Sequence, residues 1–495
     1  MSTYKASILN YIFNSINSIV VIVNGIVMVP IYFHYMSVST YGAWLATGNV
    51  VAMLGLLESG FASVITQKLS VAIAQNNVRK VQVLSGSNLA TAIGLSLTIL
   101  MLGLSISPFI SGWVNAEISA SNDIFWAYVV ALISSCIGLM NSLLGAFPQV
   151  WQDTKAVGLI NTIVNLVSIA ALVFFLLFGF GVVSIALSYL SRALLNFIFQ
   201  GSWIIKNWKK IGFAKPLFRF KETIQLTRDC FYPFMSKLSG LLMDNTQSFI
   251  LAHFLNPTFA AVYDLTAKVC YVGCSFVSMT NGSFFALFSL TLASKDKEKI
   301  NSVFSNTTKF FVLSLSLVAL NSICFTEPIC RYWVGLDKFG GTLLLVTIVI
   351  SKVFFQLKSY CNNILYTGGL INRSAKLDIL CMFVYIVLLI AIIKPTQVLA
   401  VPIATLVSSS LFIVWYVRMM KDDLNLDINL MIKELVKAFA LIIPFVIFHF
   451  AISVDYENVA TYIVYFILIS ICFFSMLYFI NKVFVHQIIS KLHRK

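Results

Sequence analysis

Long apolar runs follow one another along the whole chain, separated by short polar connectors. A transmembrane helix needs about 20 apolar residues, and the runs are too continuous for the alternating strands of a transmembrane barrel. The pattern predicts an all-α polytopic membrane protein with about fourteen transmembrane helices. We expect them at 8–33, 42–65, 83–107, 123–147, 157–178, 181–203, 230–254, 260–288, 309–326, 341–366, 377–393, 396–417, 437–453 and 460–481.

Composition supports this prediction and locates the charge. Hydrophobic residues make up 59% of the 495 residues and charged residues 11%, against about 25% in a typical soluble domain. The net charge of +15 does not indicate a nucleic-acid partner, because most Lys and Arg residues fall in the connectors of one side. Only Arg331, Lys338 and Lys394 fall in those of the other. This is the positive-inside pattern with both termini cytoplasmic, and it favours contact between the basic connector and anionic lipids.

Weak matches at a similar offset indicate that the chain is duplicated. PFISGWVN at 108–115 resembles PICRYWVG at 328–335, and Asn141 matches Asn362. Because each half would hold an even number of spans, a pseudo-two-fold axis along the membrane normal would relate them. We expect an N-terminal six-helix bundle at 1–203, a basic cytoplasmic linker at 204–229, a C-terminal six-helix bundle at 230–417, and two extra helices with a cytoplasmic tail at 418–495.

Motifs of catalysis and metal binding are absent from the sequence. It has no GxxxxGKS/T, HExxH or GxSxG motif, and its nine cysteines form no CxxC pair. We therefore expect no enzyme, no metal and no bound cofactor.

Charged residues inside the expected spans are the first candidates for function. Each costs about 2.5–3.5 kcal/mol at a helix centre, so it must face protein or water rather than lipid. Arg192 and Lys352 have no carboxylate within reach on their own helices, and surplus cations suit an anionic substrate. Away from the span ends, these candidates are Glu58, Arg192, Lys237, Asp244, Asp264, Lys268, Lys352 and Lys358.

Polar residues accompany these charges at helical spacing and predict a water-filled cavity between the two bundles. The sixth span carries Asn196 four residues after Arg192. The candidate substrate-binding cations are Arg192, Lys237, Lys268, Lys352 and Lys358, and the candidate polar lining residues are Asn10, Asn14, Asn17, Gln356 and Asn363.

Structural roles are the alternative for several of these residues. Lys237 and Asp244 share a helix face, and Asp264 and Lys268 have the spacing of a helical ion pair. The asparagines of the first span are equally typical of helix–helix hydrogen bonds. Glu58 either pairs with a Lys or Arg of another span or changes its charge during transport.

The chain resembles the polysaccharide (Wzx-type, O-antigen) flippases of the multidrug/oligosaccharidyl-lipid/polysaccharide (MOP) exporter superfamily. The resemblance covers nearly the whole chain and rests on Tyr41-Gly42, Leu57-Glu58-Ser59-Gly60, the segment 263–268 and Tyr332-Trp333-Val334-Gly335. One departure concerns Glu58-Ser59-Gly60, where the family more often has Asp-Leu-Gly.

This resemblance implies a flippase that moves undecaprenyl-pyrophosphate-linked repeat units, such as those of O-antigen in lipopolysaccharide biosynthesis, across the bacterial inner membrane by alternating access. It implies coupling to a proton or sodium gradient, for which Glu58, Asp244 and Asp264 are the candidates. A polysaccharide polymerase and a chain-length regulator are the implied protein partners, and a monomer would suffice.

Other functions stay open on the sequence alone. A cation-coupled multidrug exporter or a lipid II flippase of the same superfamily would have a similar pattern of spans. A membrane polysaccharide polymerase, which belongs to a different class, would also be polytopic but would be expected to carry a large outer loop.

Overall fold

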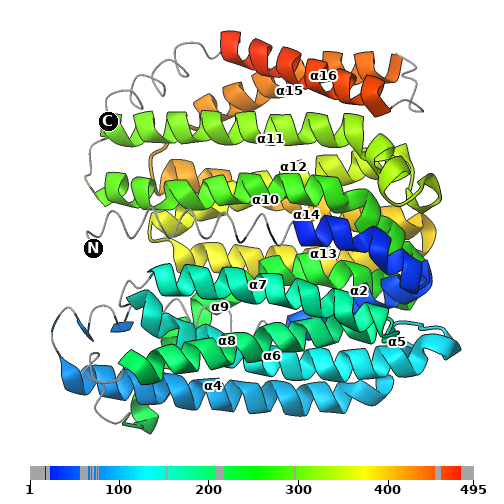
Figure 1. Cartoon of the computed structure of the whole chain (residues 1–495). Helices are drawn as coiled ribbons and strands as arrows, with labels where there is room; N and C mark the ends of the chain where they lie inside the picture. The colour runs from blue at the N-terminus through cyan, green and yellow to red at the C-terminus, as the bar shows by residue number, and fades with distance from the viewer. Residues whose placement is uncertain are drawn as a thin grey trace. The chain divides into compact units, whose positions relative to one another are not determined.

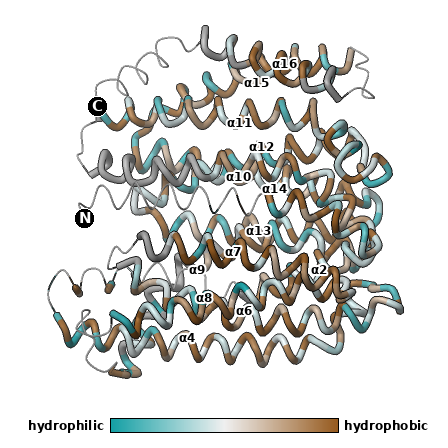
Figure 2. Tube along the Cα trace, viewed as in Figure 1, coloured by the Kyte–Doolittle hydropathy of each residue, from teal (hydrophilic) through white to brown (hydrophobic). Residues whose placement is uncertain are grey.

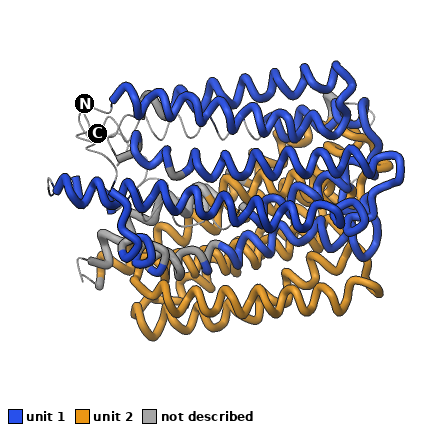
Figure 3. Tube along the Cα trace, turned by 90° about the horizontal axis from the view of Figure 1, so that it is seen from below, with its two compact units in different colours: residues 1–261 blue, residues 262–495 orange. Residues whose placement is uncertain are grey.

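The fold is known from a computed structural model. It describes residues 23–55, 77–150, 154–207, 217–293, 297–451 and 459–480, together with residues 17, 20, 65, 66, 68, 69, 72, 73 and 75. The chain divides into two compact units, unit 1 at Met1–Ala261 and unit 2 at Val262–Lys495, which Figure 3 colours separately.

All regular secondary structure in the described ranges is helical (Figure 1), which confirms the all-α prediction. In unit 1, residues 23–35 are largely helical and are followed by α2 (Val38–Gly55), α4 (Val78–Ile106), α5 (Ile110–Trp113), α6 (Ser121–Val150), α7 (Thr154–Leu177), α8 (Val183–Asn207) and α9 (Phe220–Phe254). α10 (Pro257–Ala293) crosses the division. Unit 2 continues with α11 (Lys297–Trp333), α12 (Thr342–Thr367), α13 (Ile371–Thr396), α14 (Ala400–Asp422), α15 (Ile428–Ala451) and α16 (Val459–Ile480).

Each expected span overlaps a helix, and the protein is a multi-pass membrane protein. Eight helical segments of the described ranges are long and apolar enough by themselves to cross a membrane. Hydrophobic residues run along the helices in Figure 2. Large apolar side chains such as Leu97, Met101 and Leu166 are exposed in the protein alone, as helices facing lipid require.

Two helices are much longer than their apolar runs. α11 has 37 residues, although the expected span covers only 309–326, and α9 begins at Phe220 rather than at 230. Hydropathy locates the part of a helix that can lie in lipid. The helix itself continues into polar sequence until a helix-breaking residue such as Gly or Pro ends it. The first twelve residues of α11 contain neither of these.

The two units repeat one packing order. In unit 1, α8 packs along both α6 and α7, and in unit 2, α14 packs along both α12 and α13. The matched asparagines nevertheless have different partners. Asn141 donates from Nδ2 to the Ala193 carbonyl of α8 at 2.7 Å, whereas Asn362 donates to Asp378 Oδ2 of α13 at 2.9 Å.

The helix α9 packs on α2 and α4 and lies in unit 1, whereas the sequence places this span in the second bundle. Gly42 of α2 lies against the Pro257 carbonyl at the start of α10, where a Cβ atom would overlap that carbonyl. The compact units therefore divide after Ala261 and not in the linker at 204–229. The expected six-plus-six bundle boundaries stay a prediction.

A left-handed residue ends each of the two matched motifs. Gly335 (φ 96°) ends the second motif, and Asn115 (φ 50°) ends the first. Unlike glycine, Asn115 has a side chain, and its Nδ2 donates to the carbonyls of Ala252 and His253 in the last turn of α9, at 2.9 and 2.8 Å. The Nδ1 atom of His253 lies 2.8 Å from the carbonyl oxygen of Trp113. Because a carbonyl only accepts, Nδ1 carries the proton.

We predict that Asn115→Gly lowers the melting temperature of the purified protein. Glycine keeps the left-handed conformation but loses two hydrogen bonds, each contributing about 0.5–1.5 kcal/mol. The control is Asn425→Gly, because Asn425 has a similar φ of 53°, is exposed, and makes no side-chain hydrogen bond among the described residues. An equal melting temperature for the wild type and Asn115→Gly would show that the hydrogen bonds from Asn115 to the last turn of α9 do not stabilise the protein.

Candidate functional site

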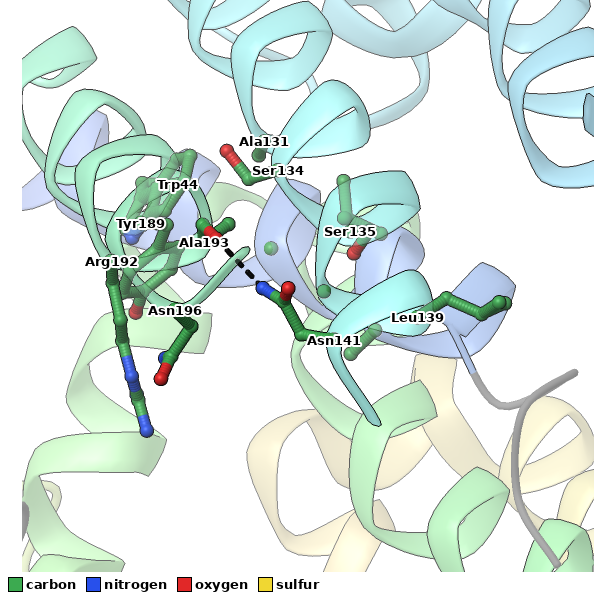
Figure 4. Close-up of a pocket in the computed structure, with 14 residues that line it drawn as sticks. Trp44, Ala131, Ser134, Ser135, Leu139, Asn141, Tyr189, Arg192, Ala193 and Asn196 are labelled. Carbon is green, nitrogen blue, oxygen red and sulfur yellow. Dashed lines mark hydrogen bonds between the residues drawn. The ribbon is translucent and has the colours of Figure 1, made fainter. Parts of the chain in front are cut away.

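Unit 1 contains a cavity of about 460 Å³ between α2, α6 and α8 (Figure 4). Small residues open the space on two of these helices: Gly48 and Ala52 on α2, and Ala131 and Gly138 on α6. Such residues leave room where larger side chains would fill the helix interface. The volume lies within the roughly 300–1,000 Å³ that is usual for ligand pockets.

Two aromatic rings line one side of the cavity. Trp44 of α2 is buried and Tyr189 of α8 is about half exposed, with ring centroids 6.1 Å apart and a tilt of 44°. Arg192 and Asn196 follow Tyr189 on the same face of α8 because they are three and seven residues further along. Figure 4 shows Tyr189, Arg192 and Asn196 in this order.

Unsatisfied acceptors lie beside these rings. Asn141 is 7% exposed and uses its Nδ2 to bind α8, but its Oδ1 is buried without a hydrogen-bond partner among the described residues. The Oδ1 atom of Asn196 is also buried without a hydrogen-bond partner among the described residues. A buried acceptor without a donor costs about 1–3 kcal/mol, so a ligand that supplies hydroxyl or amide donors would gain binding energy here.

Arg192 is the charged residue of the cavity lining. Its side chain is exposed, and no carboxylate of the described ranges forms an ion pair with it. A guanidinium has five N–H donors in a planar arrangement and binds phosphate or carboxylate through two parallel hydrogen bonds. The cavity therefore combines an apolar aromatic face, neutral acceptors and one cation.

In unit 2, Lys352 and Gln356 lie between α10 and α12. Lys352 is 5% exposed, with its Nζ 4.5 Å from the ring centroid of Tyr271 and 5.0 Å from that of Phe355. Gln356 donates to Ser278 Oγ at 3.2 Å and to the Cys274 carbonyl at 3.4 Å. Lys352 and Gln356 are both buried between packed helices. Of the two cations Lys352 and Arg192, it is therefore Arg192 that lines a cavity.

Lys358 forms an ion pair with Asp378, a carboxylate that was not among the charges expected inside the spans. Its Nζ lies 3.3 Å from Asp378 Oδ1, and both side chains are 4% exposed. Asp378 also accepts from the Tyr416 hydroxyl at 2.6 Å and from Asn362. Asp378 is the second residue of the expected span 377–393, and a charged residue at a span boundary is expected to meet water.

None of the other candidates that the structure describes is among the residues that line the cavity. Lys268 and Asp264 form the ion pair that their spacing predicts, at 3.2 Å. Asn17 Oδ1 accepts from Thr162 and Asn165 of α7, both at 3.2 Å, so it joins two helices. Asp244 is exposed on α9 and Asn363 is half-buried on α12. Asn10, Asn14, Glu58 and the Lys237 side chain lie outside the described residues.

Sequence reasoning identified Arg192 and Asn196 but not the aromatic pair. Trp44 and Tyr189 carry no charge and lie in apolar runs, so hydropathy treats them as lipid-facing or core residues. The only signal for Asn141 was its match to Asn362 in the repeat.

The fold is shared with solved structures of MATE transporters and of a lipid II flippase. A multidrug resistance MATE family transporter of the MOP superfamily, in an inward-facing conformation, has a TM-score of 0.68 with 14% identity, over 83% of this chain and 95% of that one. The lipid II flippase MurJ has a TM-score of 0.68 with 15% identity, over 95% and 99% of the two chains. A Vibrio cholerae MATE transporter has a TM-score of 0.59 with 13% identity, over 87% and 100%.

The sequence itself defines the family. The family model described as "Polysaccharide biosynthesis protein" matches residues 8–292, and the chain belongs to this family. This confirms the resemblance noted from the sequence. No curated protein matches the chain.

We predict that Asp378→Ala strongly destabilises the protein because it leaves the Lys358 ammonium buried without its carboxylate. Removing one partner of a buried pair costs about 3–5 kcal/mol. The melting temperature of detergent-purified protein should fall further than for Asp264→Ala, whose ion pair is partly exposed, with side-chain exposures of 24% and 17%. Adding Lys358→Met to Asp378→Ala should recover part of the loss. Equal losses for the two single variants would contradict this assignment.

Proposed function

We propose that this chain is a flippase that moves undecaprenyl-pyrophosphate-linked oligosaccharide repeat units, such as those of O-antigen, across the bacterial inner membrane. The observation that carries the proposal is the cavity of unit 1, where Arg192 lies without an anionic partner in the described ranges, beside Trp44 and Tyr189. Membership of the polysaccharide biosynthesis family supports the same class of substrate.

The lining suits the chemistry of a glycan attached to a pyrophosphate. A sugar ring has an apolar face of C–H groups that can lie on an aromatic ring, and its hydroxyls can donate to the free Oδ1 atoms of Asn141 and Asn196. Arg192 provides a guanidinium for the pyrophosphate or for an acidic sugar. The polyprenyl tail is apolar and can stay in the lipid throughout.

The proposal also includes candidate carboxylates for coupling transport to a proton or sodium gradient. An intramembrane carboxylate can change its charge when its surroundings change. Asp264 is held by Lys268 at 3.2 Å, so its ionised form has a local partner. Asp244 is exposed on α9. A proton or sodium role for these residues and for Glu58 stays a prediction.

A cation-coupled multidrug exporter is the second candidate, because MATE transporters share the fold. The cavity lining argues against cationic drugs, since Arg192 is its charged residue and would repel them. A lipid II flippase is a third candidate with a neighbour of the same fold.

We predict that Arg192→Gln lowers surface polysaccharide at least ten-fold in a deletion strain that depends on a plasmid copy of the gene. The loss of a charge-assisted hydrogen bond, about 1.5–3 kcal/mol, corresponds to roughly a ten- to hundred-fold effect on binding. The control is Arg418→Gln on α14, which removes an arginine that lies over the Trp415 ring, 5.8 Å from its centroid. Both variants should insert at wild-type levels. Normal polysaccharide with Arg192→Gln would remove the assigned role.

Deleting the gene should give a different phenotype for a glycan flippase, for a multidrug exporter and for a lipid II flippase. For a glycan flippase we expect the deletion strain to lose surface polysaccharide, remain viable and keep its drug susceptibility. Increased susceptibility to cationic drugs with normal polysaccharide would favour the exporter, and failure to obtain the deletion would favour the lipid II flippase.

A further inference from the structure

Two segments far apart in the sequence are joined at the start of α4 and α9. The Leu217 amide, just before α9, donates to the Gln82 carbonyl of α4 at 3.1 Å. One turn further along α4, Gly86 lies against the Leu217 backbone, and a Cβ atom there would overlap the Leu217 carbonyl. Because Gly86 has no side chain, the first turn of α4 and the first turns of α9 form one surface. We call residues 78–80 and 217–228 the interfacial patch.

The interfacial patch exposes large apolar side chains. Val78 is 54% exposed, Phe218 59% and Phe220 69%. Leu217 and Ile224 are also about half exposed. Two exposed phenylalanines beside exposed aliphatic residues are unusual in a protein surface that faces only water.

Exposed cations accompany these apolar residues. They are Arg79, Lys80, Arg219, Lys221 and Arg228, and the patch remains positively charged when Glu222 is included. The basic and apolar side chains alternate along the chain at Phe218, Arg219, Phe220 and Lys221. A surface with this composition suits a partner that is both anionic and apolar.

The position of the patch favours a lipid as that partner. α9 begins at Phe220, although its apolar run begins at 230, so about 15 Å of helix precedes the run. With the N-terminus of the chain in the cytoplasm, both α4 and α9 begin at the cytoplasmic side. The patch then lies at the depth of the lipid headgroups, where phenylalanine and leucine reach the acyl boundary and lysine and arginine meet phosphates.

We propose that the interfacial patch is a binding surface for anionic phospholipid headgroups of the cytoplasmic leaflet. Lipid phosphates pair with Lys80, Arg219 and Lys221, while Phe218 and Phe220 insert beside the acyl chains. Because Leu217 is fixed to α4, a lipid bound there holds the cytoplasmic ends of α4 and α9 together. The surface is independent of the substrate that the cavity of unit 1 carries.

The test compares two charge-matched triple variants of the full chain in detergent. The patch variant is Lys80→Gln, Arg219→Gln and Lys221→Gln. The control variant is Lys376→Gln, Lys421→Gln and Lys433→Gln, three exposed lysines at the start of α13, the end of α14 and the start of α15. The probes are phosphatidylglycerol and phosphatidylcholine, with bound lipid measured by native mass spectrometry and stability by melting temperature.

We expect phosphatidylglycerol to bind and stabilise the wild-type protein more than phosphatidylcholine does. The patch variant should lose this preference, with phosphatidylglycerol binding at the patch weakened on the order of 100-fold for three cations, and the control variant should keep it. Without added lipid, all three proteins should melt alike. Phe218→Ser with Phe220→Ser should weaken the binding of both lipids.

Three results would overturn the proposal. The patch variant could keep the full preference for phosphatidylglycerol, or the control variant could lose it equally, which would show that total charge and not this surface decides. A lower melting temperature of the patch variant in the absence of lipid would make these cations structural. Binding of an acidic protein or a nucleic acid to the wild-type chain, without any lipid preference, would replace the lipid as the partner.

Discussion

A charged group inside a membrane-spanning helix must find its partner within the protein, because the surrounding lipid offers none. Asp378 of unit 2 is an example of how this requirement is met. Its carboxylate accepts from Lys358, Tyr416 and Asn362, so that one buried anion joins α12, α13 and α14. The Asp264–Lys268 pair follows the same rule within a single helix. These two ion pairs of unit 2 therefore follow from the cost of leaving a charge unpaired in lipid.

The cavity of unit 1 departs from this rule. Asn141 binds α8 with its amide nitrogen and leaves its oxygen unused, and the oxygen of Asn196 is likewise without a partner in the described ranges. Arg192 has no carboxylate there either. A buried acceptor without a partner reduces stability, and a ligand in the space lined by Trp44 and Tyr189 would supply donors to these two oxygens. Among the described residues, the missing carboxylate partner separates Arg192 from Lys268 and Lys358, which form ion pairs.

Sequence reasoning was accurate where the interaction is local. Apolar runs located a helix for every expected span, and the four-residue spacing of Asp264 and Lys268 predicted their ion pair. It was less accurate where distant residues meet. The partner of Lys358 lies twenty residues away at the edge of the next span. The extent of α11 was missed because hydropathy measures the part of a helix that suits lipid and not the helix itself.

The sequence by itself determined that this protein is an all-α, multi-pass membrane protein, because a long apolar run leaves the backbone no other way to satisfy its hydrogen bonds in lipid. It also determined which charges need an explanation. Only the tertiary structure decided which of those charges are neutralised and which lie open. Lys352 and Arg192 look alike in the sequence, yet one is buried against Tyr271 and Phe355 and the other lines a cavity. That difference arises from side chains on other helices, whose proximity depends on how the helices pack.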